Sequence, residues 1–584
     1  PMIHSINGGA GFNNTHQDAV RAALLIEPTD WIKNTTTVDY FKATESGSGY
    51  YLLRRNFSYS ALFVPQLGPV VGNFLGSSLD AQTDGYIAGQ KNDFYGAYTD
   101  SSGSGRANRR SEGVTNDTSI SLGDYTIRNI FGYRKNRSDQ LINTGAVGPL
   151  DLGGQPFTLF HAAAFIQRQY ITNELQFLGT IGRLNFIVGG FYNNDKPDGV
   201  SGSTFDAFTT PGTPASVVTA HVENKNKALF GQVTYKITDK LSATGGLRYS
   251  WDKVSACGGA IGNVYATDAQ CRTIAAQNIA TDGVGVVKNS GSAPSWTVGL
   301  DWKVNSDLLL YITSRRGYRA ANVNTPLFET VYTTGGTDPA CGFGTGKCVD
   351  LRPYQKTGKE KLTDVEIGEK WDFRLAGARG RINTAAYYAK YKNALQFLNA
   401  QTIIPSSAKD NPTNASFGAN VADLTIWGVE LEASVSPSDT LTISFNGAYN
   451  HTTIDRLALP AIQGIPFSKA SVSTYSPKVS GTVSANWTLP IEPLDGKVSI
   501  NGDLFMTDDF GGQNGEKLPG YNLVNLRLDW KDIGGLGLDL SGFVRNLTKE
   551  HYFASPSVLL QSFPVSSVAV GDPRTYGVTA RYSF

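Results

Sequence analysis

The chain has 584 residues, a formal net charge of +1, 40% hydrophobic and 17% charged residues, and 64 glycines. The near-zero net charge argues against a nucleic-acid-binding protein, and the absence of any run of about 18 apolar residues excludes a membrane-spanning helix. Charged residues are fewer and glycines more frequent than in typical soluble chains, which favours one very large domain over several soluble ones.

The first residues, PMIHSINGGAGFNN, are rich in glycine and asparagine and contain no signal peptide. We expect them to form a loop, and we expect the sequence to begin inside a longer precursor. The next segment, DAVRAALLIEP, is compatible with a helix, but its place in a series of strands favours a strand.

A two-residue alternation of apolar and polar side chains then runs through the chain, and helical periodicity is weak everywhere. Near residue 130, one column holds Tyr125, Ile127, Phe131 and Tyr133, and the other holds Thr126, Arg128 and Arg134. Successive side chains of a strand point to opposite faces. We count about nineteen such segments of roughly 10–15 residues, the length that a tilted strand needs to cross a bilayer.

The connections between these segments alternate between short and long. Turn-forming residues predict tight turns at 27–30, 123–124, 182–183, 238–240, 305–307, 436–439 and 534–535. Long loops are predicted at 46–108, 142–166, 199–222, 257–290, 325–358, 398–417 and 456–474.

Tight turns at one rim and long loops at the other are the plan of an outer-membrane barrel. We therefore predict an all-β fold, a large antiparallel transmembrane β-barrel over residues 1–584, with short periplasmic turns and long extracellular loops such as 46–108. Its apolar column would face lipid and its polar column the lumen. The alternative is a soluble, multi-sheet β protein of the cell surface.

Several motifs occur in a fixed order along the second half of the chain. LLLYITSRRGYRAANVNTP carries Tyr311, Gly317, Tyr318 and Asn324; the following hairpins carry Glu366, Gly368 and Lys370, then Gly428 and Glu430; GFVRNLTKEHY and DPRTYGVTARYSF close the chain. Over about half of the chain this order resembles the TonB-dependent outer-membrane receptors. Thr313 and Thr548 stand where that family more often has Ser and Phe.

The resemblance implies a 22-stranded barrel around an N-terminal plug. It also implies a bacterial outer-membrane location, import of a scarce ligand such as a ferric siderophore, and energy from the TonB–ExbB–ExbD complex. The barrel assembly machinery would recognise the terminal strand through Tyr576, Tyr582 and Phe584. No plug or TonB box is visible, and about three strands are lacking, so we expect both to lie upstream.

Two other functions remain open at this point. One is a plugless, porin-like passive channel. The other is a receptor for aromatic or oligosaccharide substrates that works with a surface lipoprotein. In each case the partners include outer-membrane lipid or lipopolysaccharide.

The four cysteines form two close pairs, Cys257 with Cys271 and Cys341 with Cys348. Zinc would require a second close pair or histidines at ligand spacing, and neither is present. Two local disulfides are therefore predicted, which implies an oxidising compartment. GFGTGKC at 342–348 lacks the spacing and the Ser or Thr of a phosphate-binding loop.

The sequence predicts no catalytic set, no metal site and no cofactor, and we expect no enzyme. Aromatic rings and arginines suit the capture of anionic or aromatic ligands, which makes these residues candidates for ligand contact: Tyr50, Tyr51, Arg54, Arg55, Phe94, Tyr95, Tyr98, Arg315, Arg316 and Arg319. The alternative is that the rings pack the loop on itself and that the arginines pair with luminal carboxylates. Arg315 and Arg319 share a strand face opposite to Arg316, so the three cannot all face the lumen.

Overall fold

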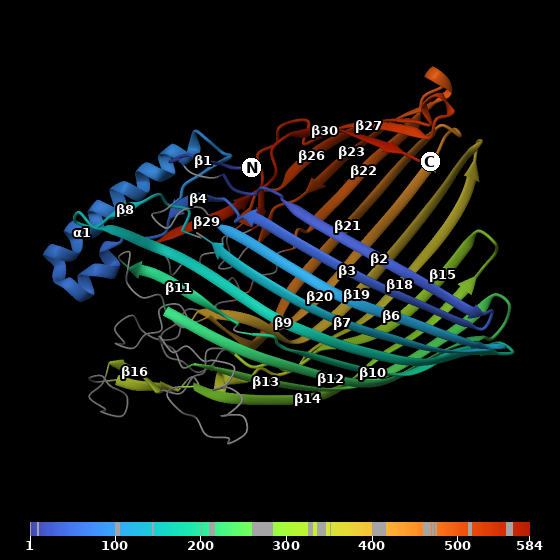
Figure 1. Cartoon of the computed structure of the whole chain (residues 1–584), viewed down its shortest axis with the longest axis horizontal. Coiled ribbons are helices and arrows are strands. Elements are labelled where there is room, and N and C mark those ends of the chain that lie inside the picture. Colours follow the sequence, from blue (N-terminus) through green and yellow to red (C-terminus); the bar gives the residue numbers. More distant parts are fainter. Residues whose placement is uncertain are drawn as a thin grey trace.

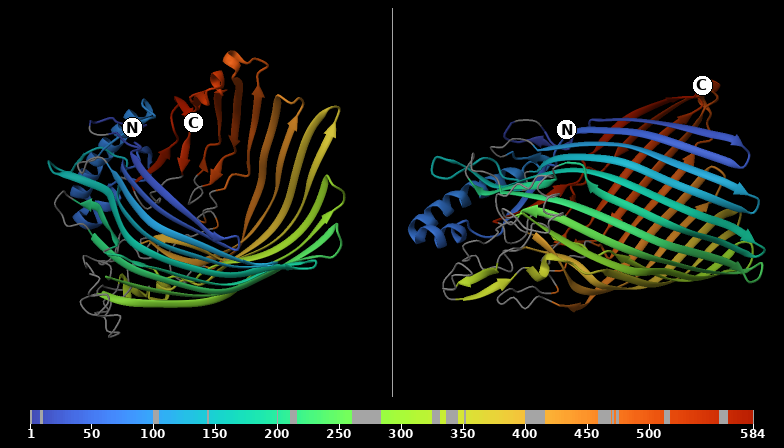
Figure 2. Two further views of the ribbon diagram at one scale, coloured as in Figure 1. Left: turned by 45° about the vertical axis from the view of Figure 1, so that its right-hand side comes forward. Right: turned by 60° about the horizontal axis from the view of Figure 1, so that its bottom comes forward.

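A computed structural model describes most of the chain. It covers residues 2–8, 11–99, 105–142, 145–199, 201–209, 216–259, 284–324, 331–335, 346–350, 352–399, 416–458, 469, 472, 476–511, 517–555 and 564–583. Within these residues, strands dominate, and they curl into a barrel-shaped wall (Figures 1 and 2).

Nineteen strands follow one another in this wall, each hydrogen-bonded to its neighbours in antiparallel register. They are β2 (Gln17–Thr29), β3 (Ile32–Ser46), β6 (Arg106–Leu122), β7 (Tyr125–Ile142), β9 (Pro156–Ile181), β10 (Leu184–Pro197), β12 (Ser216–Lys236), β13 (Leu241–Gly259), β14 (Val284–Lys303), β15 (Leu308–Arg319), β18 (Glu360–Leu375), β19 (Ala378–Asn399), β20 (Ser416–Ser436), β21 (Leu441–Leu457), β22 (Val479–Thr488), β23 (Lys497–Thr507), β26 (Tyr521–Lys531), β27 (Leu538–Arg545) and β30 (Thr575–Tyr582). The predicted number of strands and their antiparallel arrangement are confirmed.

The pairings form a single series from β2 to β30. In the described part of the chain, β2 pairs with β3 and β30 pairs with β27, and these two end strands do not pair with each other. Two short strands, β8 (Leu150–Asp151) and β11 (Gly202–Thr209), pair with the far ends of the wall strands.

The two faces of the wall differ as the alternation predicts. On β13, Leu247, Tyr249 and Trp251 share one column and are 58%, 39% and 44% exposed. The intervening column is polar: Arg248 donates to Ser250, and its guanidinium also lies over aromatic rings of neighbouring strands. Large apolar side chains exposed in register across many strands identify the outer face of the wall, and the polar column identifies the inner face.

The tight turns lie at one end of the wall and the long connections at the other (Figure 1). All seven predicted tight turns fall at or beside the short connections. Gly123 and Gly182 there have φ of +64° and +57°, a left-handed conformation that glycine adopts without strain. An eighth turn at 376–377, with Gly377 at φ +86°, was not among the predicted turns.

The segment predicted as the loop 46–108 is more ordered than the sequence indicates. It contains β4 (Tyr50–Arg55), α1 (Ser60–Lys91) and β5 (Gly96–Ala97), so a long helix forms here although helical periodicity in the sequence is weak. The helix bends sharply where Gly68 adopts φ +76°. It lies beyond the end of the wall that carries the long connections (Figure 1). No described helix is apolar over a stretch sufficient to traverse a membrane.

The remaining elements are short and belong to the connections. Beside α1, β4 forms a three-stranded sheet with β29 (Val565–Val570) and β28 (Phe553–Ser555). The others are β1 (His4–Ser5), β16 (Val331–Gly335), β17 (Gly346–Asp350), β24 (Phe510–Gly511), β25 (Lys517–Leu518) and the 3-10 helices η1 (Arg352–Gln355), η3 (Pro493–Asp495) and η5 (Ile533–Gly535).

The assignment of the faces can be tested with one matched pair of substitutions. Leu229 on β12 is 63% exposed on the outer face, and Gln232 lies on the inner column. We expect Leu229→Arg to destabilise the folded protein in lipid by about 2–4 kcal/mol, because a cation would enter the apolar belt, and Gln232→Arg to be nearly neutral. Urea unfolding in lipid vesicles measures both. Equal effects of the two substitutions would contradict the assignment.

Candidate functional site: the mouth and the inner wall

Three arginines on the inner wall each bind an aspartate on another strand. In each pair the guanidinium makes a two-pronged ion pair, the strongest geometry for these groups. The pairs are Arg134 with Asp39 at 2.7–2.8 Å, Arg128 with Asp117 at 2.5–2.9 Å, and Arg168 with Asp195 at 2.6–2.7 Å. The inner wall is therefore polar, with its charges internally compensated.

A second inner cluster gathers around Arg315, one of the predicted ligand contacts. Its guanidinium lies 2.8 Å from Asp364 and 2.6 Å from Glu366. Tyr311 donates its hydroxyl to Glu366 at 2.9 Å. Arg319 lies 3.5 Å from Glu360. Arg315 and Arg319 thus pair with carboxylates, as the alternative reading of these arginines predicts.

Arg316 belongs to the opposite column. It lies in register with Trp296 and shares its face with Ile312, which is 45% exposed on the outer wall. The three arginines are therefore divided between the two faces, and only Arg315 and Arg319 are on the luminal side.

Two motif positions must be glycine because a tyrosine ring from the neighbouring strand lies over each of them. Tyr311 is in register with Gly368, where an added Cβ would lie 2.5 Å from the tyrosine hydroxyl oxygen. Tyr387 is in register with Gly428, where a Cβ would lie 2.5 Å from its hydroxyl oxygen. A large ring lying over a glycine on the next strand fixes register and curvature. These glycines therefore shape the inner wall.

The predicted aromatic contacts of the mouth pack against one another. Phe94 stacks on His551 with ring centroids 4.5 Å apart, and Tyr51 packs against Phe94 and Phe553 at 5.4 and 5.6 Å. Tyr95 meets Phe94 edge to face at 5.1 Å, and burial raises the pKa of Tyr95 to about 12. These rings join the first long connection to the last one.

Arg55 fastens α1 to β4. Its guanidinium binds Asp84 through two hydrogen bonds of 3.0 and 3.1 Å and lies 3.2 Å from Asp80. Asp80 also accepts the backbone N–H of Tyr59 at the start of the helix. Arg54 donates to Asn56 at 3.3 Å, within the same turn.

The remaining two tyrosines of the predicted set also have packing roles. Tyr50 packs against a buried cluster that includes Leu52, and Tyr98 contacts the ring of Tyr86 with centroids 4.7 Å apart. Burial raises the pKa of Tyr59, whose hydroxyl accepts a hydrogen bond from Thr83 inside the same cluster. Ligand contact by the mouth residues stays a prediction.

Two motif asparagines hold the long connections in place. Asn324 donates to the carbonyls of Tyr354 and Gly418 and accepts the N–H of Gly418. Asn546, at φ +49°, donates to the carbonyls of Glu550 and Asp572 and accepts the N–H of Glu550. The motifs drew attention to both residues, but their bracing role depends on contacts with distant segments.

The predicted disulfide and C-terminal residues are only partly described. Cys257 at the end of β13 is disulfide-bonded, but Cys271 and Cys341 lie outside the described residues, as does Phe584. Cys348 lies on β17. The two pairings stay predictions. Tyr576 and Tyr582 share the outer column of β30, 79% and 65% exposed. In the described ranges, no three His, Cys, Asp or Glu side chains gather as a metal-binding group.

The tyrosine-over-glycine contact predicts a specific sensitivity. We expect Gly368→Ala to destabilise the barrel by about 1–3 kcal/mol, because the added methyl group would displace the Tyr311 ring. Gly317→Ala is the matched control on β15, since a Cβ there has no atom within 4 Å. Urea unfolding in micelles measures both, and equal midpoints for Gly368→Ala and wild type would refute this account.

Removal of the Arg55 ion pairs should loosen the helix without affecting the wall. We expect Arg55→Met to raise amide hydrogen exchange in residues 60–91 about tenfold, equivalent to about 1.4 kcal/mol of local stability. Lys91→Met, an exposed substitution at the end of the same helix, is the control. Unchanged exchange in Arg55→Met would show that the ion pairs do not hold the helix.

Comparison with known proteins agrees with this architecture. The family model described as "TonB dependent receptor-like, beta-barrel" matches residues 30–547. No curated protein matches the sequence. The ferric yersiniabactin uptake receptor FyuA from Yersinia pestis is similar in structure, with a TM-score of 0.68 and 14% identity over 100% of this chain and 73% of that one.

Two further solved structures have the same fold. The siderophore receptor PiuA from Acinetobacter baumannii gives a TM-score of 0.63 at 15% identity, over 98% of this chain and 75% of that one. The ferric-catecholate import receptor Fiu from E. coli K12 gives 0.59 at 14% identity, over 97% and 74%. With the family model matched over most of its length and a barrel of the same fold, this chain belongs to the TonB-dependent receptor-like β-barrel family.

Proposed function

We propose that this chain forms the barrel of a bacterial outer-membrane receptor that binds a scarce, bulky ligand at its mouth and admits it through the lumen. A ferric siderophore is the ligand class we favour. Support comes from the family and from similar structures described as receptors for ferric yersiniabactin, siderophores and ferric catecholates. At these identities the similar structures support the fold alone.

The main support for the proposal is the polar character of the inner wall. Its arginines, such as Arg134 and Arg315, are held in ion pairs along a polar surface, while the apolar side chains lie on the other face. A wall with apolar residues outside and polar residues inside surrounds a hydrated passage when it is placed in a bilayer. This arrangement is suited to binding a ligand and letting it pass through the lumen, rather than to making or breaking bonds.

The location and the energy source are parts of the same proposal. The apolar outer column supports a location of the wall in the outer membrane, and the mouth that contains α1 would lie on the extracellular side. Import against a gradient would draw on the TonB–ExbB–ExbD complex through a plug domain. A second partner is the assembly machinery, which would bind the terminal strand at Tyr576 and Tyr582.

Radio-iron uptake under iron limitation tests this function. We expect cells that carry the gene to accumulate at least one of three probes, ferric citrate, a ferric catecholate or a ferric hydroxamate, at least tenfold faster than cells in which the gene is deleted. An uncoupler of the proton gradient should abolish the difference. Deletion of residues 50–98 should abolish uptake and leave the barrel assembled, because the deleted contacts belong to the mouth.

The outcomes separate the candidate functions. Uptake that persists in the presence of the uncoupler would identify a passive channel. Equal uptake with and without the gene for all three probes would exclude these iron complexes as ligands. Retention of uptake after the deletion would show that residues 50–98 are not the capture site.

A further inference from the structure

The bend of the helix α1 carries an exposed apolar surface. Val70 and Phe74 are 82% and 73% exposed, and Leu67 and Val71 are about half exposed. We call the surface formed by these four residues the helix tip. It lies beyond the end of the wall (Figure 1), so lipid around the strands does not cover it. None of the proposed steps of ligand import uses it.

Contacts between its two arms make α1 a hairpin with the helix tip at the apex. The chain reverses at Gly68. Beyond this residue, Gly72 lies against the backbone of Val64 and Gly76 lies against Ser60, so closely that an added Cβ would clash. Helices inside membranes pack in this way, through small residues that let two backbones approach closely.

The base of the hairpin is fixed to the mouth. Arg55 on β4 lies 3.0 Å from Asp84 and 3.2 Å from Asp80. Leu79, one turn from these aspartates, belongs to the buried cluster that includes Leu52. From this base the helix extends beyond the end of the wall (Figures 1 and 2). The helix tip is therefore held away from the membrane that would contain the barrel.

The apolar part of the hairpin is short and uncharged. The sequence has no charged residue from position 56 to position 79, and Asn73 is the single polar residue between positions 67 and 76. Ser77 and Ser78 follow, and both are exposed. About seven residues at 1.5 Å each separate Val70 from Ser77, so the apolar part is about 10 Å long. Helices that bind at a membrane surface enter the lipid to about this depth.

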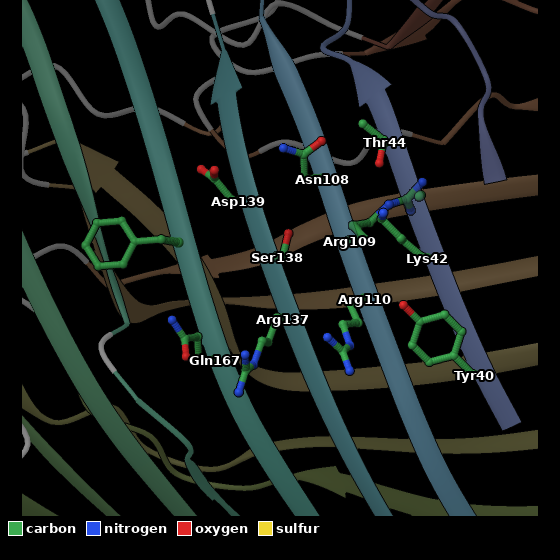
Figure 3. A pocket seen from close by; sticks show the side chains of 12 residues that line it. Tyr40, Lys42, Thr44, Asn108, Arg109, Arg110, Arg137, Ser138, Asp139 and Gln167 are labelled. Atoms are coloured by element: carbon green, nitrogen blue, oxygen red, sulfur yellow. The ribbon is translucent and has the colours of Figure 1, made fainter. Parts of the chain in front are cut away.

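The wall near the mouth has a different character. A hollow of about 700 Å³ lies near the long-connection ends of β3, β6 and β7, and Lys42, Arg110 and Arg137 are among the residues that line it (Figure 3). Charged side chains such as these are costly to bring into lipid. The helix tip carries no charged group, so it enters lipid without this cost.

The size and shape of the helix tip favour lipid over a protein partner. Its four side chains expose about 500 Å² of apolar surface, as much as the largest patch of a typical monomer. A stable protein–protein interface buries about 800 Å² on each partner and contains about one hydrogen bond per 100–200 Å². The helix tip offers less area than a second copy of this chain would need. It also projects from the surface, whereas sites for small molecules are concave.

We propose that the helix tip inserts into the surface of a phospholipid membrane that faces the mouth. The apolar side chains would enter the boundary between headgroups and acyl chains, and Ser77 and Ser78 would lie among the headgroups. The ion pairs of Arg55 would hold the base of the hairpin on the mouth. That this membrane is a different one from the membrane around the barrel rests on the proposed outer-membrane location. Insertion of the tip is independent of that location and of the ligand that the lumen carries.

Flotation with phosphatidylcholine vesicles tests the insertion, with the full chain held in nanodiscs. We expect the double variant Val70→Ser, Phe74→Ser to have a partition coefficient into vesicles at least tenfold below that of wild type. The variant Val70→Leu, Phe74→Leu should bind as wild type does, because it keeps the tip apolar. Raising the salt concentration should leave binding unchanged, since the tip is uncharged.

A matched control removes equally exposed apolar side chains elsewhere. Leu494 and Leu536 are 67% and 66% exposed, beside the 3-10 helices η3 and η5 at the short-turn end of the wall. We expect the double variant Leu494→Ser, Leu536→Ser to bind vesicles as wild type does. This control separates insertion of the helix tip from a general attraction of exposed apolar side chains to lipid.

Several outcomes would overturn the inference. These are equal vesicle binding by wild type and the Val70→Ser, Phe74→Ser variant, an equal loss of binding in the leucine control, and binding that high salt abolishes. Dimers in place of vesicle binding would assign the helix tip to a second copy of the chain. If the double variant does not fold, the single variant Phe74→Ser decides by the same measurement. Protease added to whole cells tests the orientation separately: protection of α1 would exclude a second membrane and leave the vesicle result standing.

Discussion

The structure depends on one constraint, the continuous hydrogen bonding of backbone groups between neighbouring strands. Lipid offers no partner for an unpaired N–H or C=O, so strands within a membrane must pair with one another. Among the described wall strands, all but the end strands β2 and β30 have a wall neighbour on both sides. β7 shows this clearly, since it pairs residue for residue with β6 over residues 125–141 and with β9 over residues 125–142. Once the backbone hydrogen bonds between the strands are fixed, the strict alternation of side chains determines which residues face lipid and which face the lumen.

Alternation and turn chemistry were sufficient to predict the wall. Arg128 and Arg134 were assigned to one column and Tyr125 and Ile127 to the other from the sequence alone, and the structure keeps that division. These signals are local, because a strand's two columns and a glycine turn are each visible within a few residues. The order of the motifs then indicated the family, which no single segment could do.

The helix α1 was not predicted from the sequence, and the reason is physical. Its sequence contains Gly68, Pro69, Gly72 and Gly76, residues that disfavour a helix when considered alone. In the fold, the kink at Gly68 turns the chain back so that Gly72 and Gly76 lie against the backbone of Val64 and of Ser60, where no side chain would fit. Close packing between the helix segments before and after the kink outweighs the low helix propensity of these residues. This packing depends on contacts between the two segments, which the hydrophobic periodicity of the sequence does not show.

Many contacts of the candidate site could not be predicted from the sequence, for a related reason. The pairs Arg134 with Asp39 and Arg128 with Asp117 join strands whose relative register is set by the whole ladder. The aromatic residues of the mouth were recognised as a group, but only the fold shows that Phe94 stacks on His551, a residue more than four hundred positions away in the sequence. Sequence reasoning identifies which residues are available, and the register determines which of them meet.

The pairing of the inner-wall arginines has a functional logic under the proposed role. An unpaired arginine in the passage would hold an anionic ligand and slow its release, because a desolvated ion pair is costly to break. Pairing arginines such as Arg134 and Arg315 with carboxylates leaves a wall that is polar but holds an anionic ligand only weakly.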